Sequence, residues 1–70
     1  MPKKIKEIEY VLSDEDFLDQ YITSSYEEAK EMFENEPSWV YFEKWINVWI
    51  KEGDIESLDR TIEKIEERTK

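Results

Sequence analysis

Apolar residues near the C-terminus recur at helical spacing. Ile55, Leu58, Ile62 and Ile65 stand at i, i+3, i+7 and i+10, which places them on one narrow stripe of an α-helix. Asp54 stands at the position of a helix cap, directly after the single glycine of the chain. Because this connection is short, the pattern predicts an antiparallel αα-hairpin over residues 37–70.

Residues 37–53 hold the densest group of apolar side chains, including all three tryptophans. Ser38 suits the start of a helix and Gly53 its end. On a helical wheel at about 100° per residue, the apolar side chains fill an arc of roughly 200°, whereas a surface helix needs little more than 100°. We therefore predict a central helix in contact with neighbours on two sides. One edge of the arc, formed by Tyr41, Trp45 and Val48, is a candidate binding patch because Tyr and Trp anchor protein interfaces.

Two capping patterns divide residues 13–36. Ser13 precedes a run of acids, and Ser25 is followed three positions later by Glu28 as in a capping box. Apolar residues follow each cap at helical spacing. Pro37 ends the second segment, because the residue before a proline is pushed away from helical geometry. The pattern predicts two short acidic helices.

Residues 3–12 fit two periodicities. Ile5, Ile8 and Leu12 have helical spacing, whereas Ile8, Tyr10 and Leu12 alternate as in a strand. The β-branched and aromatic composition favours a strand, but a lone strand needs a partner along its edge. We expect a short helix or an irregular arm, with a short strand as the alternative.

Together these elements predict an all-α fold, a small bundle of three to four helices in a single domain spanning residues 1–70. Its parts are an arm or short helix (1–12), two acidic helices (13–36) and the αα-hairpin (37–70). The chain has no cysteine and no histidine, which excludes disulfides and removes the usual zinc ligands. Stability must therefore come from packing, to which the aromatic residues contribute most.

The negative charge is concentrated in one segment. The chain carries 19 acids and 10 bases, a net charge of −9, and residues 13–36 contribute −8 from nine acids and Lys30. A field of this sign opposes direct binding to nucleic acid, whose affinity depends on cations. It favours a basic protein partner.

The candidate partner-binding residues are five of these acids and the aromatic edge. They are Asp16, Asp19, Glu27, Glu31, Glu34, Tyr41, Trp45 and Val48. Acids at i, i+3 and i+4 on two helices approach the density of nucleic-acid phosphates, which lie about 1.7 Å apart along the duplex axis. Small acidic phage-type inhibitors of host enzymes are similar in composition, a likeness of class without a shared motif. The leading hypothesis is a non-enzymatic protein-binding module that inhibits or modulates a basic or nucleic-acid-handling protein, with nucleic-acid mimicry as one form.

The alternative hypothesis is structural. The same aromatic edge forms a homodimer or docks the protein into a larger assembly, and the acids serve only solubility. Binding of a basic partner weakens steeply with salt, whereas an apolar homodimer does not.

Enzyme activity is disfavoured by the missing residue types. The sequence offers no histidine as a general base, no cysteine nucleophile and one glycine, too few for a phosphate-binding loop. The acidic run from Asp14 to Asp19 lacks the central glycine and final glutamate of an EF-hand. We predict no catalytic residue, no cofactor and no metal site. No apolar run approaches the roughly 18–20 residues of a transmembrane helix, so we expect no membrane contact and a cytoplasmic location.

Overall fold

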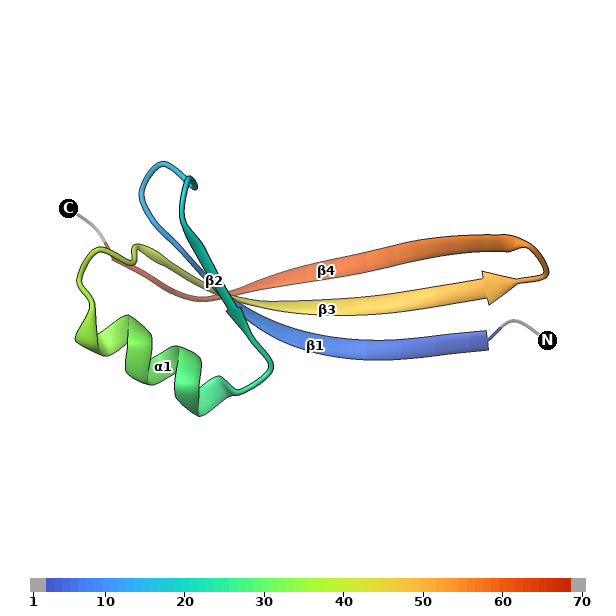
Figure 1. The fold of residues 1–70 in the computed structure, drawn as a ribbon, viewed down its shortest axis with the longest axis horizontal. Coiled ribbons are helices and arrows are strands. Elements are labelled where there is room, and N and C mark those ends of the chain that lie inside the picture. Colours follow the sequence, from blue (N-terminus) through green and yellow to red (C-terminus); the bar gives the residue numbers. More distant parts are fainter. Residues whose placement is uncertain (1–2, 69–70) are drawn as a thin grey trace.

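The computed structural model describes residues 3–68 and consists mainly of β-structure (Figure 1). The elements in chain order are β1 (Lys3–Ser13), β2 (Gln20–Thr23), α1 (Tyr26–Asn35), β3 (Tyr41–Glu52) and β4 (Ile55–Glu67). The strands form one antiparallel sheet in the order β2-β1-β3-β4. The expectation of an all-α helical bundle is therefore wrong.

Three of the strands form a long arm. The register of β1 on β3 runs from Lys3 opposite Lys51 to Ser13 opposite Tyr41, and β4 pairs with β3 over its whole length. One irregularity, between Phe42 and Glu43, interrupts the β3–β4 register. The short strand β2 pairs only with the last residues of β1. As a result the molecule is 47 Å long, and the arm extends well beyond the helix in Figure 1.

The hydrophobic core lies at one end of the sheet, where α1 packs on one face. Ala29 and Phe33 of α1 form a buried cluster with Leu12 of β1 and Phe42 of β3. The helix begins after Ser25, whose Oγ accepts a hydrogen bond from the Glu28 amide at 3.2 Å. The predicted cap at Ser25 and the end of this helix before Pro37 are confirmed. The reciprocal bond of a capping box is not formed, because the Ser25 amide donates to Thr23 Oγ1 and the Glu28 carboxylate accepts from Tyr21 and Thr23.

The predicted αα-hairpin over residues 37–70 is wrong, because β3 and β4 form a β-hairpin instead. Gly53 has φ +61° and occupies the first position of a two-residue turn between Glu52 and Ile55, as in type II′ hairpins. Strand β3 is central and carries apolar side chains on both faces, so it lacks the alternation of a half-exposed strand. On a helical wheel, the same distribution gives the broad arc that suggested a central helix.

The helix expected after Ser13 is also absent. Ser13 is the last residue of β1, and the acids that follow it form a loop before β2. Asp14 organises this loop, because its carboxylate accepts hydrogen bonds from the amides of Leu18 at 2.9 Å and Asp19 at 3.3 Å. Residues 3–12, for which a strand was the alternative, lie in β1, and the strand's partners belong to the same chain.

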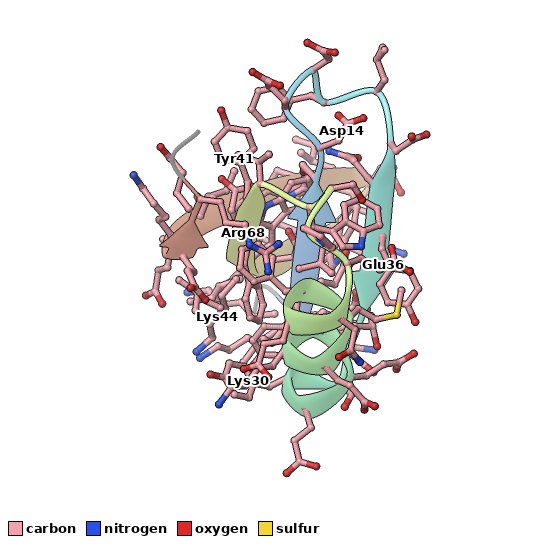
Figure 2. The ribbon with its side chains drawn as sticks, turned by 90° about the vertical axis from the view of Figure 1, so that its left-hand side faces the viewer. Asp14, Lys30, Glu36, Tyr41, Lys44 and Arg68 are labelled. Atoms are coloured by element: carbon pink, nitrogen blue, oxygen red, sulfur yellow. The ribbon has the colours of Figure 1, made fainter. Side chains whose placement is uncertain are left out.

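Arg68, directly after the end of β4, binds the C-terminal end of α1 and the connection that follows it. Its guanidinium donates hydrogen bonds to the carbonyls of Phe33, Glu36 (3.1 Å) and Trp39 (2.6 Å), the last of which lies in the connection from α1 to β3. The same guanidinium lies 4.0 Å from the centre of the Phe33 ring. A cation at the carbonyl end of a helix is favourable, so Arg68 fastens the C-terminal strand to α1 (Figure 2).

Candidate functional site

The candidate site is the face of the sheet opposite α1, which we call the helix-free face. Successive side chains of a strand point to opposite faces. Leu12 and Phe42 face the helix, so the positions that alternate with them define the other face. Across the register, its apolar members along the arm are Ile5, Trp49 and Leu58 in one row and Trp45 and Ile62 in the next row but one. Toward the helix end the same face also carries Tyr41 and the fully buried Val11.

These apolar side chains remain accessible in the single chain. Ile5 is 47% exposed, Leu58 38% and Ile62 52%, and the two tryptophans are half-buried. The helix lies on the other face, and no described element covers this part of the arm (Figure 1). Exposed apolar side chains gathered on one face are typical of interaction sites.

A polar network centred on Asn47 lies between these two apolar rows. Asn47 is only 1% exposed; it accepts a hydrogen bond from Arg60 Nε at 2.6 Å and donates one to Glu9 Oε1 at 3.1 Å. The Arg60 guanidinium also lies 4.5 Å from the centre of the Trp45 ring, a cation–π contact. The side chains of Asn47, Arg60 and Trp45 are therefore held in place before any partner binds, which lowers the entropy lost on binding.

The whole molecule has more surface than a compact chain of its size. Its accessible surface is 5304 Å², whereas a compact monomer of this mass exposes about 4,700 Å². Its radius of gyration is 14.5 Å, against about 11 Å for a compact domain of this length. The excess of about 600 Å² approaches what one partner buries in a standard protein interface.

The loop before β2 extends the apolar surface at the helix end of this face. The Phe17 ring stacks on Tyr41 with 4.7 Å between centroids, and Tyr41 belongs to the helix-free face by its register with Ser13. Phe17 has φ +59°, a left-handed conformation that costs about 1 kcal/mol for a bulky residue. The loop thus holds an exposed aromatic ring in place at a cost in backbone strain.

The structure divides the predicted site residues among four places: the two faces of the sheet, the loop before β2 and α1. Tyr41 and Trp45 lie on the helix-free face, but Val48 lies on the opposite face, where it pairs with Lys6 and Asp59. The predicted single edge was therefore a product of the helical wheel. Sequence reasoning missed Ile5, Trp49, Leu58 and Ile62 as site residues.

The predicted acids do not form one array. Asp16 and Asp19 lie in the loop before β2, and Glu27, Glu31 and Glu34 lie exposed on α1. Figure 2 shows the loop and the helix on opposite sides of the sheet. Two neighbouring acidic helices, the assumed basis for phosphate mimicry, are absent from the described residues 3–68.

One acid of α1 has an altered pKa. Tyr21 and Thr23 both donate hydrogen bonds to the Glu28 carboxylate. These bonds lower the pKa of Glu28, and the bond from Tyr21 has the larger effect. The same hydrogen bond raises the pKa of Tyr21. These contacts join β2 to the start of α1 and are structural.

Residues 3–68 contain neither a pocket nor a group of side chains suited to hold a metal ion. The one helix in that range is too short and polar to cross a membrane. No protein-family model, curated protein or solved structure matches the chain. The function is therefore inferred from the helix-free face itself.

Proposed function

We propose that the protein is a non-enzymatic protein-binding module whose contact surface is the helix-free face. One observation carries this proposal: two rows of apolar side chains, Ile5–Trp49–Leu58 and Trp45–Ile62, lie on a sheet face that no described element covers. An apolar sheet face is normally buried against a second layer. Tryptophans near the centre of such a face are the usual binding hot spots.

Site-specific photo-crosslinking tests this proposal. A benzophenone amino acid replaces Trp49 on the helix-free face, and in the matched control it replaces Ile50, the next residue on the opposite face. Each variant is irradiated both as purified protein and in an extract of its native cells. We expect protein adducts from position 49 and few from position 50. No adduct from position 49, or equal adducts from both positions, contradicts the proposal.

A second candidate function, binding of a basic protein by the acidic surface, is supported by the charge distribution. Residues 13–36 contribute −8 of the net charge of −9, and the predicted acids of this segment are exposed. In this form the protein inhibits or modulates a basic, nucleic-acid-handling partner, with the acids steering the encounter.

The test of this second candidate is the salt dependence of capture. Partners captured from the extract are eluted in steps of rising salt, with the triple variant Glu27→Gln, Glu31→Gln and Glu34→Gln beside the wild type. We expect the partners to elute from the wild type at low salt, because salt screens the attraction between exposed charges. We expect the triple variant, which lacks three of these charges, not to capture them. Capture unaffected by salt and by the variant eliminates the acidic surface as a binding site.

A further inference from the structure

We propose that the partner of the helix-free face is the same face of a second copy of this chain. Two sheets then pack into a two-layer β-sandwich with the α1 helices on its outer sides. This inference rests on the proposed function, because it identifies the occupant of the same surface. It is supported by charge pattern, symmetry and area.

The two outer strands of this face carry opposite patterns. Along β1, Lys3, Ile5 and Glu7 give a base, an apolar residue and an acid. In the same three rows, β4 has Glu56, Leu58 and Arg60, an acid, an apolar residue and a base. In these three rows, each position on one edge of the face is therefore complementary to the position in the same row on the other edge, whereas in the next row Glu9 shares its row with the apolar Ile62.

A twofold axis that runs parallel to β3 uses this complementarity. It places β1 of each copy over β4 of the other, so that each row of residues lies over the same row of the second copy. Lys3 then faces Glu56 of the partner subunit, Ile5 faces Leu58 and Glu7 faces Arg60. Because β3 lies next to the axis, Trp45 and Trp49 of both copies meet at the centre, where hot spots cluster. Sheets packed in this way lie about 10 Å apart with strands inclined by about 30°.

Other pairings of two copies can be compared with this one. An axis across the strands through the row of Glu7 places Glu7 on Glu7 and Arg60 on Arg60, whereas the axis parallel to β3 places Lys51 on Lys51 and Glu43 on Glu43. Only the parallel axis brings Lys3 to Glu56 of the partner subunit, so a charge swap at these two residues distinguishes the two axes. The opposite face carries α1 at one end, so two copies in step would bring their helices into the same space. Pairing along the edges of two β4 strands is opposed by the many charged side chains of this edge strand, which has five acids and two bases.

The available area is near the lower limit for a specific dimer. Strand β1 has 11 residues; at about 3.3 Å per residue and about 4.8 Å per strand, the three-stranded face covers about 500 Å² per copy before side-chain relief is included. Two copies therefore bury about 1,000 Å² or more, the size at which specific interfaces begin. We expect a dimer of micromolar affinity that depends on protein concentration.

The net charge of the face is compatible with self-association. It carries four bases (Lys3, Lys51, Arg60, Lys64) and five acids (Glu7, Glu9, Glu43, Glu56, Glu67), or −1 of the total of −9. Residues 13–36, which include the loop, β2 and the helix, carry −8 of the net charge. Salt screens the repulsion between the two copies more than the apolar contact, so the dimer should persist at high salt.

Sedimentation equilibrium from about 1 µM to about 1 mM, a range that covers micromolar affinity, tests the dimer. Trp49→Gln should shift the dissociation constant upward by at least tenfold. The matched control Ile55→Gln, at a residue that is 73% exposed and on the other face by its register with Glu52, should leave it unchanged. Far-UV circular dichroism checks that each variant retains the sheet.

A charge swap tests the axis. Lys3→Glu and Glu56→Lys should each weaken the dimer about tenfold, because each replaces two attractions across the axis by two repulsions. The double variant should restore wild-type affinity, since the pairing is only reversed. Within one copy the two residues are separated by Lys51 of β3, so the rescue reports on the contact between copies.

The outcomes separate this inference from the proposed function. A monomer at every concentration overturns the dimer, and crosslinks from position 49 to a different protein then leave the proposed function intact. A dimer that tolerates Trp49→Gln, or that the double charge swap does not rescue, overturns this mode of association. An absence of crosslinks from position 49, both to itself and to other proteins, removes the proposed function as well.

Discussion

Arg68 is the residue on which the attachment of α1 to the end of β4 depends most directly. It donates hydrogen bonds to three backbone carbonyls at and after the end of α1, and hydrogen bonds from a charged donor contribute more than neutral ones. We expect Arg68→Ala to lower the free energy of unfolding by about 2 kcal/mol, measured by urea denaturation. Arg68→Lys should recover only part of the loss, because an ammonium group lacks the planar fork.

Lys64→Ala is the matched control for Arg68. Lys64 forms an ion pair with Glu67 at 3.2 Å, and both side chains are largely exposed. An exposed pair of this kind contributes about 0.5 kcal/mol or less. If the two alanine variants lose similar stability, the carbonyl contacts of Arg68 do not hold the helix.

The contact between Tyr21 and Glu28 gives the stability a defined pH dependence. The Tyr21 hydrogen bond holds the pKa of Glu28 below 4.5, so this contribution is present above the unfolded pKa and is lost as the pH falls through the folded pKa. The pKa of Tyr21 is raised above 10.0 by the same bond, so its contribution is complete below 10.0 and is lost as the pH rises through the folded value.

Tyr21→Phe isolates this effect. Removing the hydroxyl should raise the pKa of Glu28 toward its ordinary value, because only the Thr23 hydrogen bond then favours the carboxylate. The measurement is an NMR titration of the Glu28 side-chain carboxyl. An unchanged Glu28 pKa in Tyr21→Phe contradicts the assigned cause. Glu31, an exposed acid on the same helix, serves as the internal control.

Among the elements, the β3–β4 hairpin depends on the conformation of one residue. Gly53 has φ +61°, and an added Cβ meets no atom within 4 Å, so an alanine here is opposed by backbone conformation alone. Gly53→Ala should lower the free energy of unfolding by about 1–2 kcal/mol. D-alanine at the same position, introduced by chemical synthesis, favours positive φ and should not destabilise. Equal losses for the two enantiomers contradict this account of the turn.

The sequence allowed α1 to be predicted and offered a strand over residues 3–12 as the alternative, but it did not reveal β2, β3 or β4, for a physical reason. The signals for α1 are local. Ser25 caps the helix by accepting a hydrogen bond from the Glu28 amide, and Pro37 follows the end of the helix within a few residues. The strands depend on pairing between residues far apart in the chain, such as Ile5 with Trp49. In β3 both faces are apolar, and in β4 the isoleucines and leucine happen to match helical spacing, so neither strand shows clean alternation.

The candidate site was predicted in part for the same reason. The tryptophans of residues 37–53 indicated an interface, and Trp45 lies on the helix-free face. Ile5 and Leu58 join that face only through the registers of β1 and β4 with β3, which no local pattern specifies. Val48 was misplaced because a strand sends residues 45 and 48 to opposite faces, whereas a helix sends them to one.

At the scale of the whole molecule, the core and the candidate site lie in different regions. The buried cluster of Leu12, Ala29, Phe33 and Phe42 is at the helix end of the sheet, whereas Trp49 and its row lie far along the arm (Figure 1). The arm therefore has strand pairing but no second layer in the single chain. Opening of its backbone hydrogen bonds should require less free energy than opening of the core.

Hydrogen exchange at two protein concentrations connects this difference to the proposed dimer. If two copies cover each other's arms, the arm opens only after the copies separate, so the protection of β3 amides near Trp49 should rise with protein concentration. The α1 amides, which open by local detachment of the helix, should exchange at the same rate at both concentrations. Lys3→Glu, which weakens the dimer, should abolish the concentration dependence in β3. Protection of β3 that is equally strong in dilute wild type and in Lys3→Glu shows that the three paired strands of the arm are stable without a second layer.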